Sequence, residues 1–456
     1  MLKRKITQVI IDFLKFEPEK ILLVNGARQI GKSYIIRYVG QMLYKNFIEI
    51  NLKEDKEGDR MFAEVQTTDD LYIRLGNYTD RELGNKEDTL VFLDEIQSYP
   101  HLLTLLKFLR EDGRYRFIAS GSELGIALAG TPSVPLGSVS IKQMYPLDFE
   151  EFLWATGVSS EWISTMKDRY LQNLSLDSNS HALILKRFQY YLLIGGLPEA
   201  VNAYIADRNI LRVRDIQSDI HTLYKIDASQ YDEEHKLSIR RIYDLIPSNL
   251  ENKKKRIRYR GIEDKKGKTF SDYAEEFEYL TNSGVALEVT AISNPVFPLI
   301  ESEQKKLIKL YLNDVGILTD LLYKTNVNAV LQDIKSINLG AVYESVVAQE
   351  LSAHGFALHY YDNKKKGEVD FLIDDYQSLS VLPLEIKSGK DYTRHRALTN
   401  FLENTDYKIR KAIVFSNERE VREKNGIWYM PIYYVMFLNT TLPEDAGVLP
   451  PLEPIG

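Results

Sequence analysis

The N-terminal part of the chain alternates short apolar runs with stretches of helical spacing. Apolar runs that stop at a glycine or at acidic residues are typical of buried strands in a parallel sheet. Between them, residues 32–44 and 101–112 space their apolar positions three or four apart, as a helix does. Strands that alternate with helices predict an α/β domain with a parallel sheet. The predicted strands lie at 21–25, 47–52, 89–96 and 115–122.

From about Pro146 the apolar positions follow a helical period, at 148–157 and again at 181–196. A further helix at 269–284 is followed by an apolar strand at 285–292. Helices that precede a small strand element are typical of a winged helix-turn-helix, so the pattern favours such a segment here.

A third region begins near residue 306. Its first strong signal is an amphipathic helix at 339–355 that ends at a glycine. The order that follows, three strands, a helix and a strand, predicts a second α/β domain. The strands are expected at 356–362, 367–374, 380–388 and 411–416, and the second helix at 395–404.

Composition limits the class of protein. A chain of 456 residues with 44% hydrophobic and 27% charged side chains can bury several cores. No run of 18 apolar residues occurs, so no membrane contact is expected. The basic, amphipathic N-terminus is not expected to be a signal peptide. The absence of cysteine excludes disulfides, thiol catalysis and cysteine-ligated zinc, and it fits a reducing cytoplasm, which is the expected location.

The charge distribution is uneven. A net charge of −7 argues against a uniformly basic nucleic-acid-binding protein. The stretch at 251–268 is the exception, with nine Lys or Arg residues against three acids. Two interpretations stay open for it: a contact with DNA phosphates, and a solvated loop.

The stretch GARQIGKS has the order GxxxxGK[ST] between a predicted strand and a predicted helix. Its glycines let backbone N–H groups close around phosphate oxygens where a Cβ would obstruct them. Lys32 is predicted to reach the β- and γ-phosphates of a nucleotide, and the Ser33 hydroxyl to bind Mg²⁺. The helix that follows directs its N-terminal dipole toward the anion. The residues predicted to hold the nucleotide are Gly26, Ala27, Arg28, Gln29, Ile30, Gly31, Lys32, Ser33 and Tyr34.

The strand LVFLDEI supplies the acids that an ATP site also needs. Asp94 is predicted to hold Mg²⁺ through water, and Glu95 to polarise the attacking water. On the next strand, Ser120 or Ser122 is a candidate sensor of the γ-phosphate, with an ordinary serine-rich turn as the alternative. Arg28 either contacts phosphate or faces solvent. Together with the glycine-rich loop, these acids predict that the chain binds and hydrolyses ATP.

A second set of charged residues lies in the C-terminal region. Glu385 and Lys387 stand two apart on one predicted strand, so they share a face. Asp370 lies on the preceding strand and Glu344 on the helix before it. Glu344, Asp370 and Glu385 are suited to bind Mg²⁺, while Lys387 positions water or steadies a developing charge. An ordinary salt-bridged strand pair is the alternative.

Together, these segments resemble a family of prokaryotic AAA-type P-loop ATPases that carry a C-terminal restriction-endonuclease-like domain of unknown function. The resemblance covers most of the chain. YPLDFEEFL and GGLPEAV are its most specific parts, because general physics does not demand them. The motifs are GARQIGKS, LVFLDEIQSYP, FIASGSELGIAL, MYPLDFEEFLWA, YLLIGGLPEAV, DIHTLYKID, KLIKLYLNDVGIL, GAVYESVVAQEL, GEVDFLI and LEIKSG.

The resemblance implies the same roles for the loop residues and for the acids after it, and its nuclease-like motif falls on the C-terminal set. Many relatives carry a glycine-arginine pair where this chain has LAGTPSVPLGSVSIK, so no arginine role is assigned there. The implied parts are an ATPase core at 1–150, a helical lid at 151–209, a winged-helix segment at 210–305, a restriction-endonuclease-like α/β domain at 306–438 and an irregular tail at 439–456.

Three functions compete. The first is an ATPase, with ATP and Mg²⁺ as cofactors, whose nucleotide state controls a C-terminal half that binds or cleaves double-stranded DNA. The second is a nucleotide-dependent switch whose nuclease-like domain is inactive and binds DNA or a protein partner. The third is a protein-only regulator of a signalling or defence system, which fits the net acidity better. The oligomeric state does not follow from the sequence.

Overall fold

The computed structural model describes residues 2–17, 19–79, 83–129, 137–230, 235–252, 254–264, 267–332, 337, 339–365, 367–389 and 391–440. These residues form two compact units, each assembled from segments that are far apart in the chain. The first unit contains the described residues up to Ser159, together with Tyr190–Leu287 and Tyr311–Val327. The second unit contains Ser160–Gln189, Glu288–Leu310 and the described residues from Asn328 on.

Parts of three expected features lie outside the described residues. These are residues 441–456 of the expected tail, residues 130–136 of the stretch that departs from the family, and Lys253, Lys265 and Lys266 of the basic run. The linear division of the chain into five parts stays a prediction.

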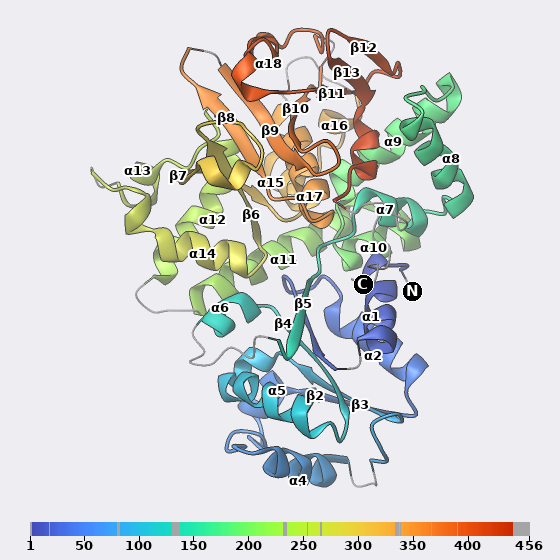
Figure 1. The fold of residues 1–456 in the computed structure, drawn as a ribbon, viewed down its shortest axis with the longest axis vertical. Helices are drawn as coiled ribbons and strands as arrows, with labels where there is room; N and C mark the ends of the chain where they lie inside the picture. Colours follow the sequence, from blue (N-terminus) through green and yellow to red (C-terminus); the bar gives the residue numbers. More distant parts are fainter. Residues whose placement is uncertain are drawn as a thin grey trace, which may run out of the picture. The chain divides into compact units, whose positions relative to one another are not determined.

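The sheet of the first unit has five parallel strands in the order β2-β3-β4-β1-β5 (Figure 1). The four strands that the apolar pattern predicts are all present. The pattern does not predict β5, because this edge strand has the mixed sequence VSIKQ and is partly exposed. The strands are β1 (Ile21–Asn25), β2 (Asn46–Asn51), β3 (Thr89–Asp94), β4 (Arg116–Gly121) and β5 (Val139–Gln143).

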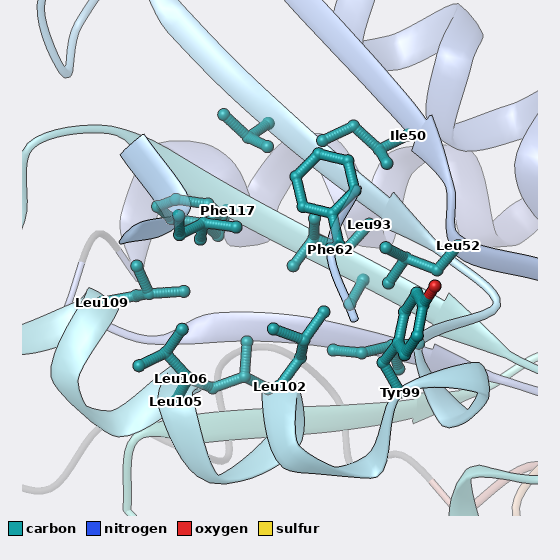
Figure 2. Close-up of a cluster of buried hydrophobic side chains, with 14 of the residues drawn as sticks. Ile50, Leu52, Phe62, Leu93, Tyr99, Leu102, Leu105, Leu106, Leu109 and Phe117 are labelled. Atoms are coloured by element: carbon teal, nitrogen blue, oxygen red, sulfur yellow. The ribbon is translucent and has the colours of Figure 1, made fainter. Parts of the chain in front are cut away.

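The helix α5 (Pro100–Asp112) packs its leucine-rich face against this sheet, where Phe117 of β4 belongs to the same buried cluster (Figure 2). Pro100 occupies its first turn and Gly113, with a φ of +66°, follows its end. Each buried leucine contributes roughly 1.5–3 kcal/mol, so this face fixes the helix beside the strands that carry the candidate site. The buried leucines are Leu102, Leu103, Leu105, Leu106 and Leu109.

A capping box begins the helix α7 (Phe149–Ala155). The Asp148 side chain accepts from the Glu151 backbone N–H at 2.9 Å, and the Glu151 side chain accepts from the Asp148 backbone N–H at 3.3 Å. Glu151 also accepts from the buried Arg4 guanidinium at 3.0 Å. The acidic residues of the motif YPLDFEEFL therefore cap a helix and hold the N-terminal segment.

Further helices complete the first unit. Before α7 these are α1 (Lys5–Phe16), α2 (Lys32–Leu43), α3 (Leu52–Glu57), α4 (Thr68–Thr79) and α6 (Leu124–Ala129). After α7 they are α10 (Pro198–Asp207), α11 (Ile210–Gln230), α12 (Lys236–Leu250), α13 (Tyr259–Glu263), α14 (Ala274–Asn282) and α15 (Val315–Tyr323). The chain passes between the units within α9 (Ser178–Ile194).

The second unit contains most of an eight-stranded sheet in the order β12-β13-β11-β10-β9-β8-β6-β7 (Figure 1). The predicted order of helix, three strands, helix and strand is present at 340–416. The strands are β6 (Ala286–Ile292), β7 (Glu303–Leu312), β8 (His359–Asn363), β9 (Gly367–Asp375), β10 (Ser380–Ile386), β11 (Ala412–Ser416), β12 (Arg422–Lys424) and β13 (Ile427–Pro431). Its helices include α8 (Ser160–Leu171), α16 (Asn328–Leu331), α17 (Gly340–Ala353) and α18 (Arg396–Leu402).

The strand expected within the winged-helix segment is β6, and it pairs in parallel with β8 of this sheet, with Thr290 opposite His359. A winged-helix fold is therefore not confirmed.

In the part of the chain that the structure describes, no helix is long and apolar enough to cross a membrane.

Candidate functional site

The glycine-rich loop joins β1 to α2. Gly26 has a φ of +151°, and a Cβ at this residue would lie 2.3 Å from the Met144 carbonyl oxygen. Gly31 has a φ of +93°, in the left-handed region that favours glycine. The loop therefore needs both glycines for reasons of backbone geometry.

The Lys32 side chain curls back into the loop and is buried. Its Nζ donates to the carbonyl oxygens of Gly26 and Ala27, both at 2.9 Å. Burial lowers the pKa of Lys32, and the carboxylates of Glu95 and Asp94 act against that shift. An ammonium held among backbone atoms at the start of a helix is well placed to meet an anion.

Ser33 and Asp94 meet at the carboxyl end of β3. Ser33 Oγ donates to Asp94 Oδ2 at 2.7 Å, and Ser120 Oγ donates to Asp94 Oδ1. Burial raises the pKa of Asp94, while the two hydroxyl groups act in the opposite direction. A hydroxyl and a carboxylate oxygen in contact are hard oxygen donors of the kind that Mg²⁺ prefers, so the residues present fit this ion.

Glu95 follows β3 in a left-handed backbone conformation, with φ 54° and ψ 48°. Its Oε2 accepts from Gln97 Nε2 at 2.5 Å and from Ser122 Oγ at 3.3 Å. The carboxylate is therefore held in one orientation by two donors. Of the two candidate serines, Ser120 contacts Asp94 and Ser122 contacts Glu95.

Arg28 is paired within the protein, and a contact of this residue with phosphate stays a prediction. Its guanidinium donates to Asp227 Oδ1 of α11 at 2.5 Å and to Ser122 Oγ at 3.2 Å. Its side chain is 24% exposed, so it does not simply face solvent. The local sequence holds no signal for this pairing, because Asp227 is 199 residues away along the chain.

A cavity of about 570 Å³ lies beside the loop and has the size of a small-molecule site. Gln29, Ile30, Gly31 and Tyr34, all predicted from the loop motif, line one side of it. The sequence does not identify the other walls. They come from the N-terminal segment, α10 and α11, through Leu2, Arg4, Pro198, Asn202, Ala203 and Ile216.

The motif GGLPEAV forms the turn that leads into α10 and brings Pro198 to this cavity. The backbone N–H of Gly196 donates to Asp314 Oδ2 at 2.6 Å, and a Cβ at Gly195 would lie 2.1 Å from Asp314 Oδ1. Asp314 is fully buried, which raises its pKa to about 6. The glycines are therefore needed where the turn packs against this carboxylate.

The predicted C-terminal residues lie close together in the second unit. Lys387 Nζ donates to Glu385 Oε1 at 2.6 Å, and Asp370 Oδ2 accepts from the backbone N–H of Ile386 at 2.8 Å. Burial raises the pKa of Glu385, and Lys387 opposes it. Burial lowers the pKa of Lys387, but Glu385, Asp370 and Glu344 outweigh it and raise the value.

Two further charged residues belong to this group and are not predicted. Glu368 on β9 adds its charge to those that raise the pKa of Glu385, and it forms an ion pair with the buried Lys309 of β7. Glu368 could be found from its place two residues before Asp370, because alternate residues of a strand share a face. Lys309 could not be found in this way, because the sequence pattern does not predict β7, the strand that carries it.

The described part of the chain holds no group of three or more His, Cys, Asp or Glu side chains that could bind a metal ion. The magnesium site predicted at Glu344, Asp370 and Glu385 stays a prediction.

Three family models match parts of the sequence. One, described as an AAA domain, matches residues 18–153. The other two are described as domains of unknown function, DUF8612 over residues 185–328 and DUF4143 over residues 339–435. No curated protein matches the chain.

Several solved structures are distantly similar. The Walker-type ATPase paby2304 of Pyrococcus abyssi matches 71% of this chain and 96% of its own, at 17% identity and a TM-score of 0.41. The RuvB Holliday junction branch migration motor of Thermotoga maritima matches 62% of this chain and 89% of its own, at 14% identity and a TM-score of 0.28. PCH-2 of C. elegans matches 45% of this chain and 60% of its own, at 12% identity and a TM-score of 0.26.

The AAA match agrees with the parallel sheet and the glycine-rich loop of the first unit. The models that match the remainder carry no described function, so a restriction-endonuclease-like domain is not confirmed. Residues 18–153 thus match an AAA domain in sequence and have the parallel sheet and glycine-rich loop of a P-loop fold.

Proposed function

We propose that the chain is a Mg²⁺-dependent ATPase whose nucleotide state controls its C-terminal half. The observation that carries the proposal is the contact of Ser33 with Asp94, beside the buried ammonium of Lys32. In this proposal the cation binds at Ser33 and Asp94 and the phosphates bind at Lys32, next to each other, as a metal-bound triphosphate requires.

Each residue of the loop has a role in this proposal. The backbone N–H groups of residues 26–33 and the Lys32 ammonium bind the β- and γ-phosphates. Ser33 and Asp94 hold Mg²⁺, which neutralises charge on the phosphate oxygens when it is bound. Glu95 orients the attacking water and accepts its proton. The adenine base of ATP enters the cavity beside Tyr34.

The test is ATP hydrolysis by the wild type, Lys32→Ala and Lys107→Ala. Lys107 is an exposed lysine of α5 and serves as the matched control. We expect Lys32→Ala to lower the rate by at least about 100-fold, because it removes the positive charge that stabilises the transferred phosphoryl group. Lys107→Ala should stay within twofold of the wild type. Hydrolysis that survives Lys32→Ala would reject the proposal.

The same assay in the presence of double-stranded DNA tests whether the ATPase acts on nucleic acid or on a protein partner. Stimulation by DNA would support a machine that acts on nucleic acid. An unchanged rate would support the protein-directed switch.

For the C-terminal half, we propose binding of double-stranded DNA with cleavage at the set formed by Asp370, Glu385 and Lys387. The proposal is supported by their proximity: Lys387 Nζ donates to Glu385 Oε1 at 2.6 Å, and Asp370 Oδ2 accepts from the backbone N–H of Ile386, between them in sequence, at 2.8 Å. In the presence of Mg²⁺ and ATP the wild type should nick plasmid DNA, and Asp370→Ala should not. Asp406→Ala, at an exposed aspartate of the same unit, is the control. Nicking that persists in Asp370→Ala would contradict the proposal.

A binding module without cleavage is the second candidate. The ion pair of 2.6 Å between Lys387 and Glu385 favours this candidate, because the charge of Glu385 that would bind a metal ion is already compensated by the ammonium of Lys387. Wild-type protein that binds DNA without nicking it, and keeps that binding in Lys387→Ala, would support this candidate.

A further inference from the structure

The helix α11 contacts the glycine-rich loop through two side chains. The buried Tyr224 donates its hydroxyl to the carbonyl oxygen of Arg28 at 2.8 Å. Asp227, one turn further on, accepts from Arg28 Nη1 at 2.5 Å. Both residues belong to the motif DIHTLYKID, for which the proposed function supplies no role.

From Asp227 a chain of hydrogen bonds with a fixed direction leads to Glu95. A guanidinium only donates, so Arg28 donates to Asp227 and, through Nε, to Ser122 Oγ at 3.2 Å. The Ser122 hydroxyl accepts that bond and a second, longer one from Gln97 Nε2 at 3.4 Å, and it donates its own hydrogen to Glu95 Oε2 at 3.3 Å. Asp227 thus holds the guanidinium whose Nε–H is one of the donors to the Ser122 hydroxyl.

The Asp227–Arg28 pair is shielded from solvent, with side-chain exposures of 14% and 24%. Burial raises the pKa of Asp227 and the Arg28 charge opposes that rise. Tyr279 of α14 donates its hydroxyl to the Asp227 backbone carbonyl at 3.2 Å, which fixes this end of α11. A shielded pair anchored on both partners holds its geometry better than an exposed one.

We infer that Asp227 is a positioning residue of the ATPase site: by holding Arg28 it orients Ser122, and through Ser122 the carboxylate of Glu95. The inference rests on the proposed function and extends it to control of the hydrolysis rate. Asp227 lies in α11, outside the residues that match the AAA domain. Asp227 does not line the cavity proposed for the nucleotide base, so its displacement would change the rate of hydrolysis through Arg28 and Ser122 rather than through that cavity.

The experiment measures kcat and KM for ATP in Asp227→Asn, Ser122→Ala, the double variant and a control, Asp244→Asn. Asp244 also forms an ion pair with α11, through Lys225 at 2.7 Å, but does not touch Arg28. We expect Asp227→Asn and Ser122→Ala each to lower kcat about tenfold with KM within twofold, since a misplaced catalytic group costs rate rather than binding.

The double variant distinguishes the relay from two separate structural defects. Residues that act through one chain are not additive, so the double variant should lose no more than about twofold beyond either single variant. Asp227→Glu should recover part of the rate. If Asp227→Asn does not fold, Arg28→Lys tests the same chain, because a single ammonium cannot reproduce the two directed bonds of the guanidinium.

Three results would overturn the inference: a kcat in Asp227→Asn equal to that of Asp244→Asn, a rise in KM with kcat unchanged, or fully additive losses in the double variant. Absence of Lys32-dependent hydrolysis in the wild type would instead reject the proposed function, and the relay with it. The two failures are therefore distinguishable in one set of assays.

Discussion

The two charged sites of the molecule use acidic residues in opposite ways. In the first unit, Asp94 faces the hydroxyl groups of Ser33 and Ser120, which leaves its negative charge to attract a cation. In the second unit, Glu385 is bound to the ammonium of Lys387. The carboxylate of the first site is thus bound by neutral groups, whereas the charge of Glu385 in the second site is opposed by that of Lys387.

The largest effect is expected from the same substitution made in both sites. Asp94→Asn should lower ATP hydrolysis by at least about 100-fold, because it removes the charge that holds the cation next to the phosphates. Asp370→Asn should leave ATP hydrolysis within twofold of the wild type. Steady-state ATPase rates check both variants, and an equal loss in the two would show that the sites are not separate in function.

A glycine in each region provides the next test. In Gly26→Ala the new methyl group would lie 2.3 Å from a backbone oxygen, at a φ of +151°. We expect a loss of at least about 2 kcal/mol in the free energy of unfolding. No described heavy atom lies within 4 Å of the Cβ position at Gly389, so Gly389→Ala should change this free energy by less than about 0.5 kcal/mol. Urea denaturation of both variants measures the difference.

A smaller, pH-dependent effect is expected at the second site. Burial already raises the pKa of Glu385, and Lys387→Met would raise it further. The folded protein then binds this proton more tightly than the unfolded chain, so its stability falls as pH rises from the ordinary glutamate pKa through the raised folded value.

The loss in Lys387→Met should accordingly be about 1–3 kcal/mol at pH 8 and less at pH 5. Urea denaturation at the two pH values measures it, with the exposed Lys364→Met as control. A loss of the same size at both pH values would mean that the pair contributes packing rather than charge.

The smallest effect concerns the basic run of 251–268. Arg260 is 70% exposed and pairs with Asp264 at 3.4 Å, so Arg260→Gln should leave folding unchanged. If this run contacts DNA, the slope of log affinity against log salt concentration should fall by about 1 in the variant. A slope equal to that of the wild type would identify the run as a solvated loop.

Features that depend on local sequence are predicted well. The strands β1 to β4 follow from apolar runs, and the backbone of the loop follows from glycines at fixed spacing. Both signals arise within a few residues, so one sequence suffices to find them. The roles proposed for Ser33, Asp94 and Glu95 remain predictions, although the structure brings these residues close to one another.

Features that depend on distant partners are not predicted. The Arg28–Asp227 pair and the walls of the cavity join segments that no local pattern connects. The strand β7 escapes prediction because its first half, EQKK, is polar and exposed while its second half is buried. Neither half alternates as a strand with one solvated face would.

The left-handed backbone of Glu95 has a consequence for engineering. A non-glycine residue with a φ of 54° costs roughly 1–2 kcal/mol, a cost that glycine would not incur. A search for stabilising substitutions would therefore favour Glu95→Gly and remove the carboxylate proposed to activate water. At this one position, a more robust fold and a working catalyst require different amino acids.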